Sequence, residues 1–100
     1  MPRNKIQNTL AKIQNKMYFY KNINFMNRTV RELGEILADM YTNAPRKEQV
    51  TMIHLFGVKY HEDVQREGVR EVIEASGIHS TYRTELNKAI KLARYVVPIQ

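Results

Sequence analysis

The stretch of residues 69–97 constrains the fold more strongly than any other part of this chain. It reads VREVIEASGIHSTYRTELNKAIKLARYVV, an acidic segment followed by a longer basic one. Helical spacing places the apolar residues of the first segment on one side, at Val69, Val72 and Ile73. Gly77 stands where the chain must reverse, because positive φ costs little only for glycine, and Ile78 can fill the angle that follows. The pattern predicts a helix-turn-helix.

The second helix of this motif, predicted over residues 80–96, has two distinct faces. The apolar face is formed by Tyr82, Leu86, Ala89, Ile90, Ala93 and Val97. The opposite face holds only hydrogen-bonding and cationic side chains, namely Ser80, Arg83, Thr84, Asn87, Lys88, Lys91 and Arg94. We expect Ser80 or His79 to cap this helix. Alternatively, a free amide at the same end binds a phosphate oxygen, since a helix N-terminus attracts anions.

The polar face matches the chemistry of a DNA major groove. Arg83 has the fork geometry that suits guanine, and Asn87 can pair bidentately with adenine. The cations nearer the end of the helix suit phosphates. The predicted DNA-contacting residues are Ser80, Thr81, Arg83, Thr84, Asn87, Lys88, Lys91 and Arg94. The competing interpretation is a solvated polar surface, which every amphipathic surface helix has.

Residues 29–97 resemble a small bacterial family described as helix-turn-helix-like and largely uncharacterised. The segments that carry the resemblance are TVRELGEILADMY, VTMIHLFGVKY and VIEASGIHSTYRTELNKAIKLARYV. The resemblance implies a compact all-helical domain with a presumed DNA-binding role, and it supplies no ligand and no catalytic residue. The chain departs from the general motif at Ile73, where alanine is usual, and at Arg83, where a buried aliphatic residue is common. Tyr82 and Leu86 supply the missing core contacts if the second helix is rotated.

Local signals predict the remaining helices. Thr29 and Glu32 form a capping box, so a helix should begin there and continue in helical period to about Tyr41. Pro45 can occupy the first turn of the next helix, and Gly57 is expected to end or bend it. Residues 60–65 are predicted to form a further short helix before the next glycine. Together with the motif, these elements predict an all-α domain of four or five helices over residues 29–100.

The first 28 residues are predicted to form a basic helix or arm followed by a linker. A helix starting near Asn4 would carry an apolar stripe at Ile6, Leu10, Ile13 and Met17. Residues 18–25 favour either a linker or a short strand, because they combine strand formers with aromatic side chains.

Charge is distributed unevenly along the chain, whose formal net charge is +6. Residues 1–31 carry seven basic and no acidic side chains, residues 32–78 carry five basic and nine acidic ones, and residues 79–100 carry four basic and one acidic. Such polarity orients a molecule in the field of a polyanion, because bound cations release the counterions of the phosphates. We expect phosphate contacts from the arm through Arg3, Lys5, Lys12 and Lys16.

Other chemistry has little support in the sequence. There is no cysteine, and the three histidines lack the spacing of a helical zinc site, so we expect neither a metal nor a cofactor. Gly-rich phosphate loops and the setting of an activated serine are also absent, which makes an enzyme the least favoured class. No run of about 18 apolar residues and no secretory leader is visible, so we expect a cytoplasmic protein without a membrane span.

The leading hypothesis is therefore a small bacterial or phage transcriptional regulator that binds double-stranded DNA. The alternative is a non-enzymatic adaptor or inhibitor that binds a partner protein through its N-terminal apolar and aromatic segment, since methionine and tyrosine favour contact surfaces. That surface could also join two copies of the chain in a homodimer, which would pair two DNA half-sites. RNA binding through Tyr18, Phe19 and Tyr20 ranks below both hypotheses.

Overall fold

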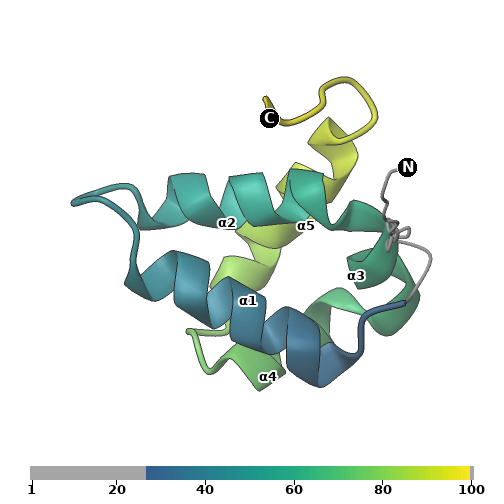
Figure 1. Cartoon of the computed structure of the whole chain (residues 1–100), viewed down its shortest axis with the longest axis horizontal. Helices are drawn as coiled ribbons and strands as arrows, with labels where there is room; N and C mark the ends of the chain where they lie inside the picture. Colours follow the sequence, from purple (N-terminus) through teal and green to yellow (C-terminus); the bar gives the residue numbers. More distant parts are fainter. Residues whose placement is uncertain (1–26, 100) are drawn as a thin grey trace, which may run out of the picture.

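The computed structural model describes residues 27–99, which form five α-helices (Figure 1). These are α1 (Val30–Thr42), α2 (Gln49–Lys59), α3 (His61–Glu67), α4 (Val69–Ser76) and α5 (Tyr82–Leu92). The described residues contain no strand, so the prediction of an all-α fold with four or five helices is confirmed. The predicted N-terminal helix and the linker or strand at residues 18–25 lie outside the described residues.

Helix α1 begins at the predicted capping box. The Glu32 amide donates to Thr29 Oγ1 at 3.1 Å, and the Thr29 amide donates to Glu32 Oε1 at 2.9 Å. Both bonds satisfy amide groups that the first turn of a helix leaves without a partner. At the other end, the Asn43 amide and side-chain Nδ2 both donate to the carbonyl oxygen of Asp39 at 3.0 Å. Both ends of α1 are thus determined by local hydrogen bonds.

Helix α2 differs from its prediction at both ends. Pro45 is not in its first turn, because the Pro45 carbonyl accepts the Glu48 amide in a separate turn and Lys47 has a left-handed φ of 68°. The helix therefore starts at Gln49. Gly57 does not end the helix, which continues to Lys59. The glycine is required by packing instead, since a Cβ at this position would collide with Ala89 of α5.

The helices pack mainly in two pairs, α1 against α4 and α2 against α5. Each pair meets at a glycine and an alanine. A Cβ at Gly34 would lie 2.6 Å from the Cβ of Ala75, and Gly57 faces Ala89 in the same way. The core between the two pairs is formed by Leu33, Leu37, Ile53, Phe56, Val64, Val72, Ile73, Leu86 and Ile90. Small residues at the two crossings let the backbones approach closely, which brings these side chains together in one core.

Helix α3 is the short helix predicted after Tyr60, and it holds the start of the domain in place. Arg28 Nη1 lies 3.1 Å from Asp63 Oδ2, and the Arg28 guanidinium sits 4.9 Å from the centre of the Tyr60 ring. Arg66 donates to the Arg28 carbonyl at 2.8 Å and pairs with Asp63 at 2.9 Å. The hydrogen bonds to Asp63 and Glu67 raise the pKa of Arg66. The segment before α1 is therefore attached to α3. No helix within residues 27–99 combines the length and apolar character that a membrane span needs.

Candidate nucleic-acid interface

Helix α5 presents one face to the core and the other to solvent. Leu86 and Ala89 are buried, Ile90 is 8% exposed, and Tyr82 packs partly buried against the core. Arg83, by contrast, is exposed. From Tyr82 to Ile90 the helix is therefore oriented as its apolar stripe predicts, with Tyr82 and Leu86 filling positions that the general motif gives to other residues. The helix ends at Leu92 rather than at residue 96, so Arg94 lies in the turn that follows it and Val97, which the pattern places on the apolar face, is exposed. All of the outward side chains that the sequence predicts are exposed, which are Ser80, Thr81, Arg83, Thr84, Asn87, Lys88, Lys91 and Arg94.

The turn before α5 is built by its own side chains. Gly77 adopts a left-handed φ of 78° and ends α4, as its position in the sequence predicts. Ser76 Oγ donates to the Ile73 carbonyl at 2.6 Å and accepts the Ile78 amide at 3.2 Å. These two bonds hold the chain in the reversed direction after the glycine. Ile78 then packs partly buried against the core, where it fills the angle between α4 and α5.

The start of α5 is capped by a histidine ring. Thr81, the residue before the helix, makes no side-chain cap, but its amide donates to His79 Nδ1 at 3.1 Å and its hydroxyl lies 3.0 Å from the same nitrogen. Nδ1 must accept here, so the neutral ring carries its proton on Nε2. The amides of Tyr82, Arg83 and Thr84 donate to carbonyls three residues earlier. The expected cap is therefore present, and these amides have acceptors in the chain, so none is a free site for a phosphate oxygen.

The position of this helix end also depends on α1. Tyr41 Oη donates to Tyr82 Oη at 3.2 Å, and the two ring centres are 5.4 Å apart. The hydrogen bond with Tyr82 raises the pKa of Tyr41, and burial adds to the effect. The role of Tyr41 is not evident from its place in the sequence. No spacing rule could have found it, since the two tyrosines are separated by 41 residues.

The cations on the outward face of α5 differ in their surroundings. Among residues 27–99, no carboxylate oxygen lies within 4.0 Å of the charged nitrogens of Arg83, Lys91 or Arg94. Lys88 is 3.5 Å from Glu85, which also bonds to His54 Nε2 at 2.8 Å. The hydrogen bond with His54, and secondarily the charge of Lys88, holds the pKa of Glu85 below its ordinary value although partial burial opposes the shift. Glu85 thus joins α5 to α2 at the border of the cationic face.

Cations on the other helices are mostly neutralised. Arg31 lies 3.1 Å from Glu35, and Arg70 lies 3.6 Å from Glu71. Arg28 and Arg66 are held by acids of α3, as described above. Each such pair has no net charge, so these surfaces attract a polyanion much less than the face of α5 does. Among the helices, α5 therefore carries most of the positive charge that is free of a carboxylate within the described residues.

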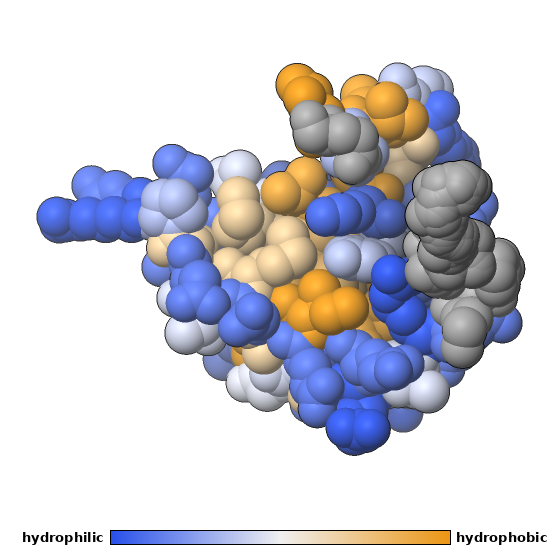
Figure 2. All heavy atoms as spheres, in the orientation of Figure 1, coloured by the Kyte–Doolittle hydropathy of each residue, from blue (hydrophilic) through white to orange (hydrophobic). Residues whose placement is uncertain are grey.

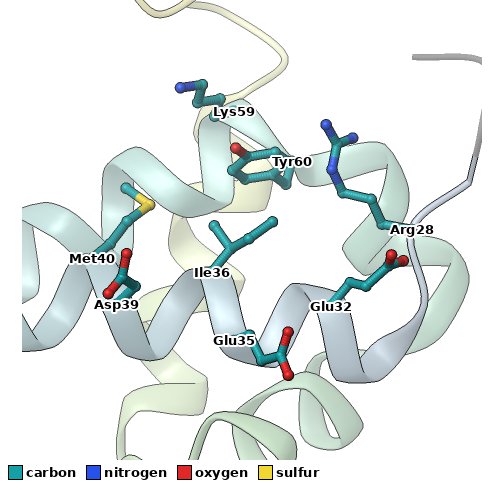
Figure 3. A pocket seen from close by; sticks show the side chains of 8 residues that line it. All are labelled: Arg28, Glu32, Glu35, Ile36, Asp39, Met40, Lys59 and Tyr60. Carbon is teal, nitrogen blue, oxygen red and sulfur yellow. The ribbon is translucent and has the colours of Figure 1, made fainter. Parts of the chain in front are cut away.

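A second feature of the surface is an open depression of about 690 Å³ between α1 and the junction of α2 with α3 (Figures 2 and 3). Figure 3 shows Ile36 and Met40 of α1 directed toward α2 and Tyr60. Figure 2 shows apolar residues gathered over this part of the molecule and hydrophilic ones around them. The lining residues are Arg28, Glu32, Glu35, Ile36, Asp39, Met40, Lys59 and Tyr60. Three carboxylates from α1 make this depression a poor site for a nucleic acid, and its apolar floor suits a protein segment better.

The structure thus leaves all of the predicted residues in and around α5 exposed, with Ser80 and Thr81 before the helix and Arg94 after it, and one part of the prediction has no test. The arm residues Arg3, Lys5, Lys12 and Lys16 lie outside the described residues, so contacts from them stay a prediction. Helical periodicity also overlooks Arg46 and Lys47, since both lie in a loop rather than on a helix face.

Comparison with known proteins agrees with the helix-turn-helix geometry. No curated protein and no solved structure shows significant similarity to this chain. Residues 29–99, however, match a family described as an HTH-like domain, a description that suggests a DNA-binding role. The match covers the capping box of α1, the glycine turn and the whole of α5. Because it extends over more than half of the sequence, the chain belongs to this family of HTH-like domains.

Proposed function

We propose that this protein binds double-stranded DNA by placing α5 in the major groove, and that it acts as a regulator of transcription. The observation that carries the proposal is the outward face of α5 together with the turn that follows it, where Arg83 and Lys91 on the helix and Arg94 in the turn are exposed and free of carboxylates among the described residues. A helix with this face in an HTH-like domain has the electrostatic footprint of a DNA-binding element.

Three side chains of this face form one row at helical spacing. Arg83, Asn87 and Lys91 follow one another at intervals of four residues, which places them on one ridge of the helix. In helix-turn-helix proteins the residues near the start of the second helix contact base edges. Arg83 and Asn87 are therefore the residues proposed to read guanine and adenine, respectively. Lys91 and Arg94, nearer the end, are proposed to contact phosphates, which adds affinity without sequence information.

A binding selection on the full-length chain with random duplex oligonucleotides at physiological salt tests the proposal. We expect recovery of a defined sequence, with Arg83→Ala and Asn87→Ala each relaxing specificity at particular bases by about 1–3 kcal/mol. Lys91→Ala should weaken binding to all sequences alike and reduce the salt slope by about 1. Lys59→Ala is a matched control, because Lys59 is an exposed cation at the end of α2 and lies on another face. Equal losses on every sequence for Arg83→Ala, Asn87→Ala and Lys91→Ala would rule out base readout.

A protein partner is the second candidate, and the depression lined by Ile36, Met40 and Tyr60 favours it. The adaptor hypothesis predicts that one stoichiometric partner is recovered by pull-down. Its binding should be lost on removal of residues 1–25 and should survive charge reversal at Lys88 and Lys91. The opposite pattern, loss on charge reversal and survival of the truncation, would contradict the adaptor hypothesis and favour the DNA-binding helix.

A further inference from the structure

The loop between α1 and α2 carries two adjacent cations at an exposed tip. It spans residues 43–48, and both Arg46 and Lys47 are exposed. Figure 2 shows this loop as a hydrophilic projection at one end of the molecule. Its shape is held by the turn in which the Glu48 amide donates to the Pro45 carbonyl at 2.9 Å. The two charges are therefore displayed on a defined turn beyond the body of the domain.

The electrostatic surroundings of this tip resemble those of α5. Within the described part of the chain, neither Arg46 nor Lys47 has a carboxylate oxygen within 4.0 Å of its charged nitrogens. The arginines of α1, α3 and α4, by contrast, are each held by an acid. Free positive charge is thus concentrated on α5 and on this loop, with Lys59 as the exception. Lys59 lies 5.8 Å from the centre of the Tyr60 ring.

The loop begins close to the start of α5. Asn43 follows α1 directly, and Tyr41 in the last turn of α1 is hydrogen-bonded to Tyr82 in the first turn of α5. In Figure 1, whose horizontal direction is the longest axis, the α1–α2 loop projects at the left end, and the turn between α4 and α5 lies below α1, nearer the middle of the molecule. The base of the loop is therefore close to the start of α5, and its tip projects beyond it.

The backbone of Lys47 adds an independent indication. Lys47 is the non-glycine residue with positive φ among residues 27–99, with φ of 68°. Glycine or asparagine occupies this conformation with less strain, since a Cβ crowds the backbone there. Strained positions of this kind concentrate at functional sites, where the side chain is worth more than the lost stability. A lysine at this position is unfavourable for folding, and a use of its charge in binding would explain its presence there.

We propose that Arg46 and Lys47 form a second phosphate-binding site for the duplex that α5 contacts, which deepens the proposed function and rests on it. A helix in the major groove lies between two phosphate backbones, and a loop beside the start of that helix faces one of them. The ligand class is the sugar-phosphate backbone of double-stranded DNA. The loop contributes affinity and orientation of α5 in the groove, and it does not discriminate between base sequences.

The test compares Arg46→Gln/Lys47→Gly with wild type in the full-length chain, by titration of random-sequence and selected duplexes across a sodium chloride series. Glycine at position 47 removes the charge and also relieves the backbone strain, so a loss of binding cannot come from unfolding. Each phosphate contact contributes about 0.9 to the salt slope. We expect the slope to fall by about 2 and affinity near physiological salt to fall roughly 10- to 30-fold for both duplexes. Their ratio of affinities should stay unchanged.

The matched control is Arg31→Gln/Lys59→Gln, which removes the same charge from α1 and from the far end of α2. Its slope should remain close to that of wild type. A wild-type slope for Arg46→Gln/Lys47→Gly, measured while Lys91→Ala lowers the slope, would overturn the loop site and leave the function of α5 intact. An equal reduction in the control would also overturn it, because general charge would then explain the effect. Failure of the wild-type protein to bind any duplex would refute the proposed function itself.

Discussion

The packing of α2 on α5 leads to a quantitative prediction for Gly57→Ala. A methyl group at residue 57 would collide with the Cβ of Ala89 and lie 3.0 Å from Leu86 Cδ1. Leu86 Cδ1 is the end of a flexible side chain and can move, but the Ala89 Cβ is attached directly to the backbone. The two helices must therefore separate. Replacing glycine by alanine inside a helix ordinarily gains about 1 kcal/mol, whereas overpacking a core costs about 1–3 kcal/mol. Because backbone has to shift, we expect the upper end of that range and a net loss of about 2 kcal/mol.

A compensating change in α5 separates this collision from other effects. Ala89→Gly alone should destabilise the protein by about 2 kcal/mol, since it loses helix propensity and a buried methyl group. In the combined variant Gly57→Ala/Ala89→Gly the propensity changes cancel, and the methyl group moves to the other side of the contact. Its stability should lie within about 1 kcal/mol of wild type, which makes the two substitutions strongly non-additive.

The assay is urea unfolding of the full-length protein followed by the helical circular dichroism signal, with the m value compared between variants. The reference variants are Thr51→Gly and Thr51→Ala, at an exposed position of α2. The difference between their free energies of unfolding gives the intrinsic preference of this helix for alanine over glycine. The reasoning is refuted if Gly57→Ala is as stable as wild type or more so. It is also refuted if the double variant loses the sum of the two single losses.

Three further predictions concern the turn and the start of α5. Gly77→Ala should lower stability by about 1–2 kcal/mol in the same assay, because φ is positive there and no atom within 4 Å adds a collision; an unchanged urea midpoint would contradict this. His79→Ala should lower stability by about 1 kcal/mol through loss of the cap, whereas His79→Asn, which keeps an acceptor, should retain most of it; equal losses would argue against the cap. The pKa of Glu85 is lowered from its ordinary value of 4.5, chiefly by His54, so its contribution is complete above that value and is lost as pH falls through the lower folded pKa. Unfolding midpoints measured down the acid range should therefore fall less steeply for Glu85→Gln than for wild type, and identical slopes would show that the carboxylate contributes nothing.

Elements that depend on near neighbours in the chain were predictable from the sequence. The capping box at Thr29 and Glu32 is formed as its spacing indicates. Gly77 adopts the left-handed conformation that its place between two helices requires. The outward orientation of Arg83 likewise follows from the apolar stripe of its own helix. In each case the deciding interactions lie within a few residues, which is the range over which helical periodicity and capping patterns operate.

The role of Gly57 depends on a contact outside the range of these local patterns. A glycine near the end of an apolar run predicts a helix terminus when only its neighbours are considered. In the folded protein it lies inside α2, because the contact that requires it comes from Ala89, more than 30 residues later. The same holds for the pairing of Arg28 with Asp63, which is 35 residues away. No local pattern distinguishes that neutralised arginine from the free one at position 83.

The amino-acid sequence by itself determined that this protein is helical, where its glycine turn lies and which side of α5 faces solvent. These properties follow from the conformational preferences of each residue and from side chains one helical turn apart. Only the tertiary structure decided how closely α2 and α5 approach, which cations keep their charge free, and that the end of α1, from which the loop of Arg46 and Lys47 begins, contacts the start of α5. Those outcomes depend on contacts between segments distant in sequence, which form only when the chain packs around a common core.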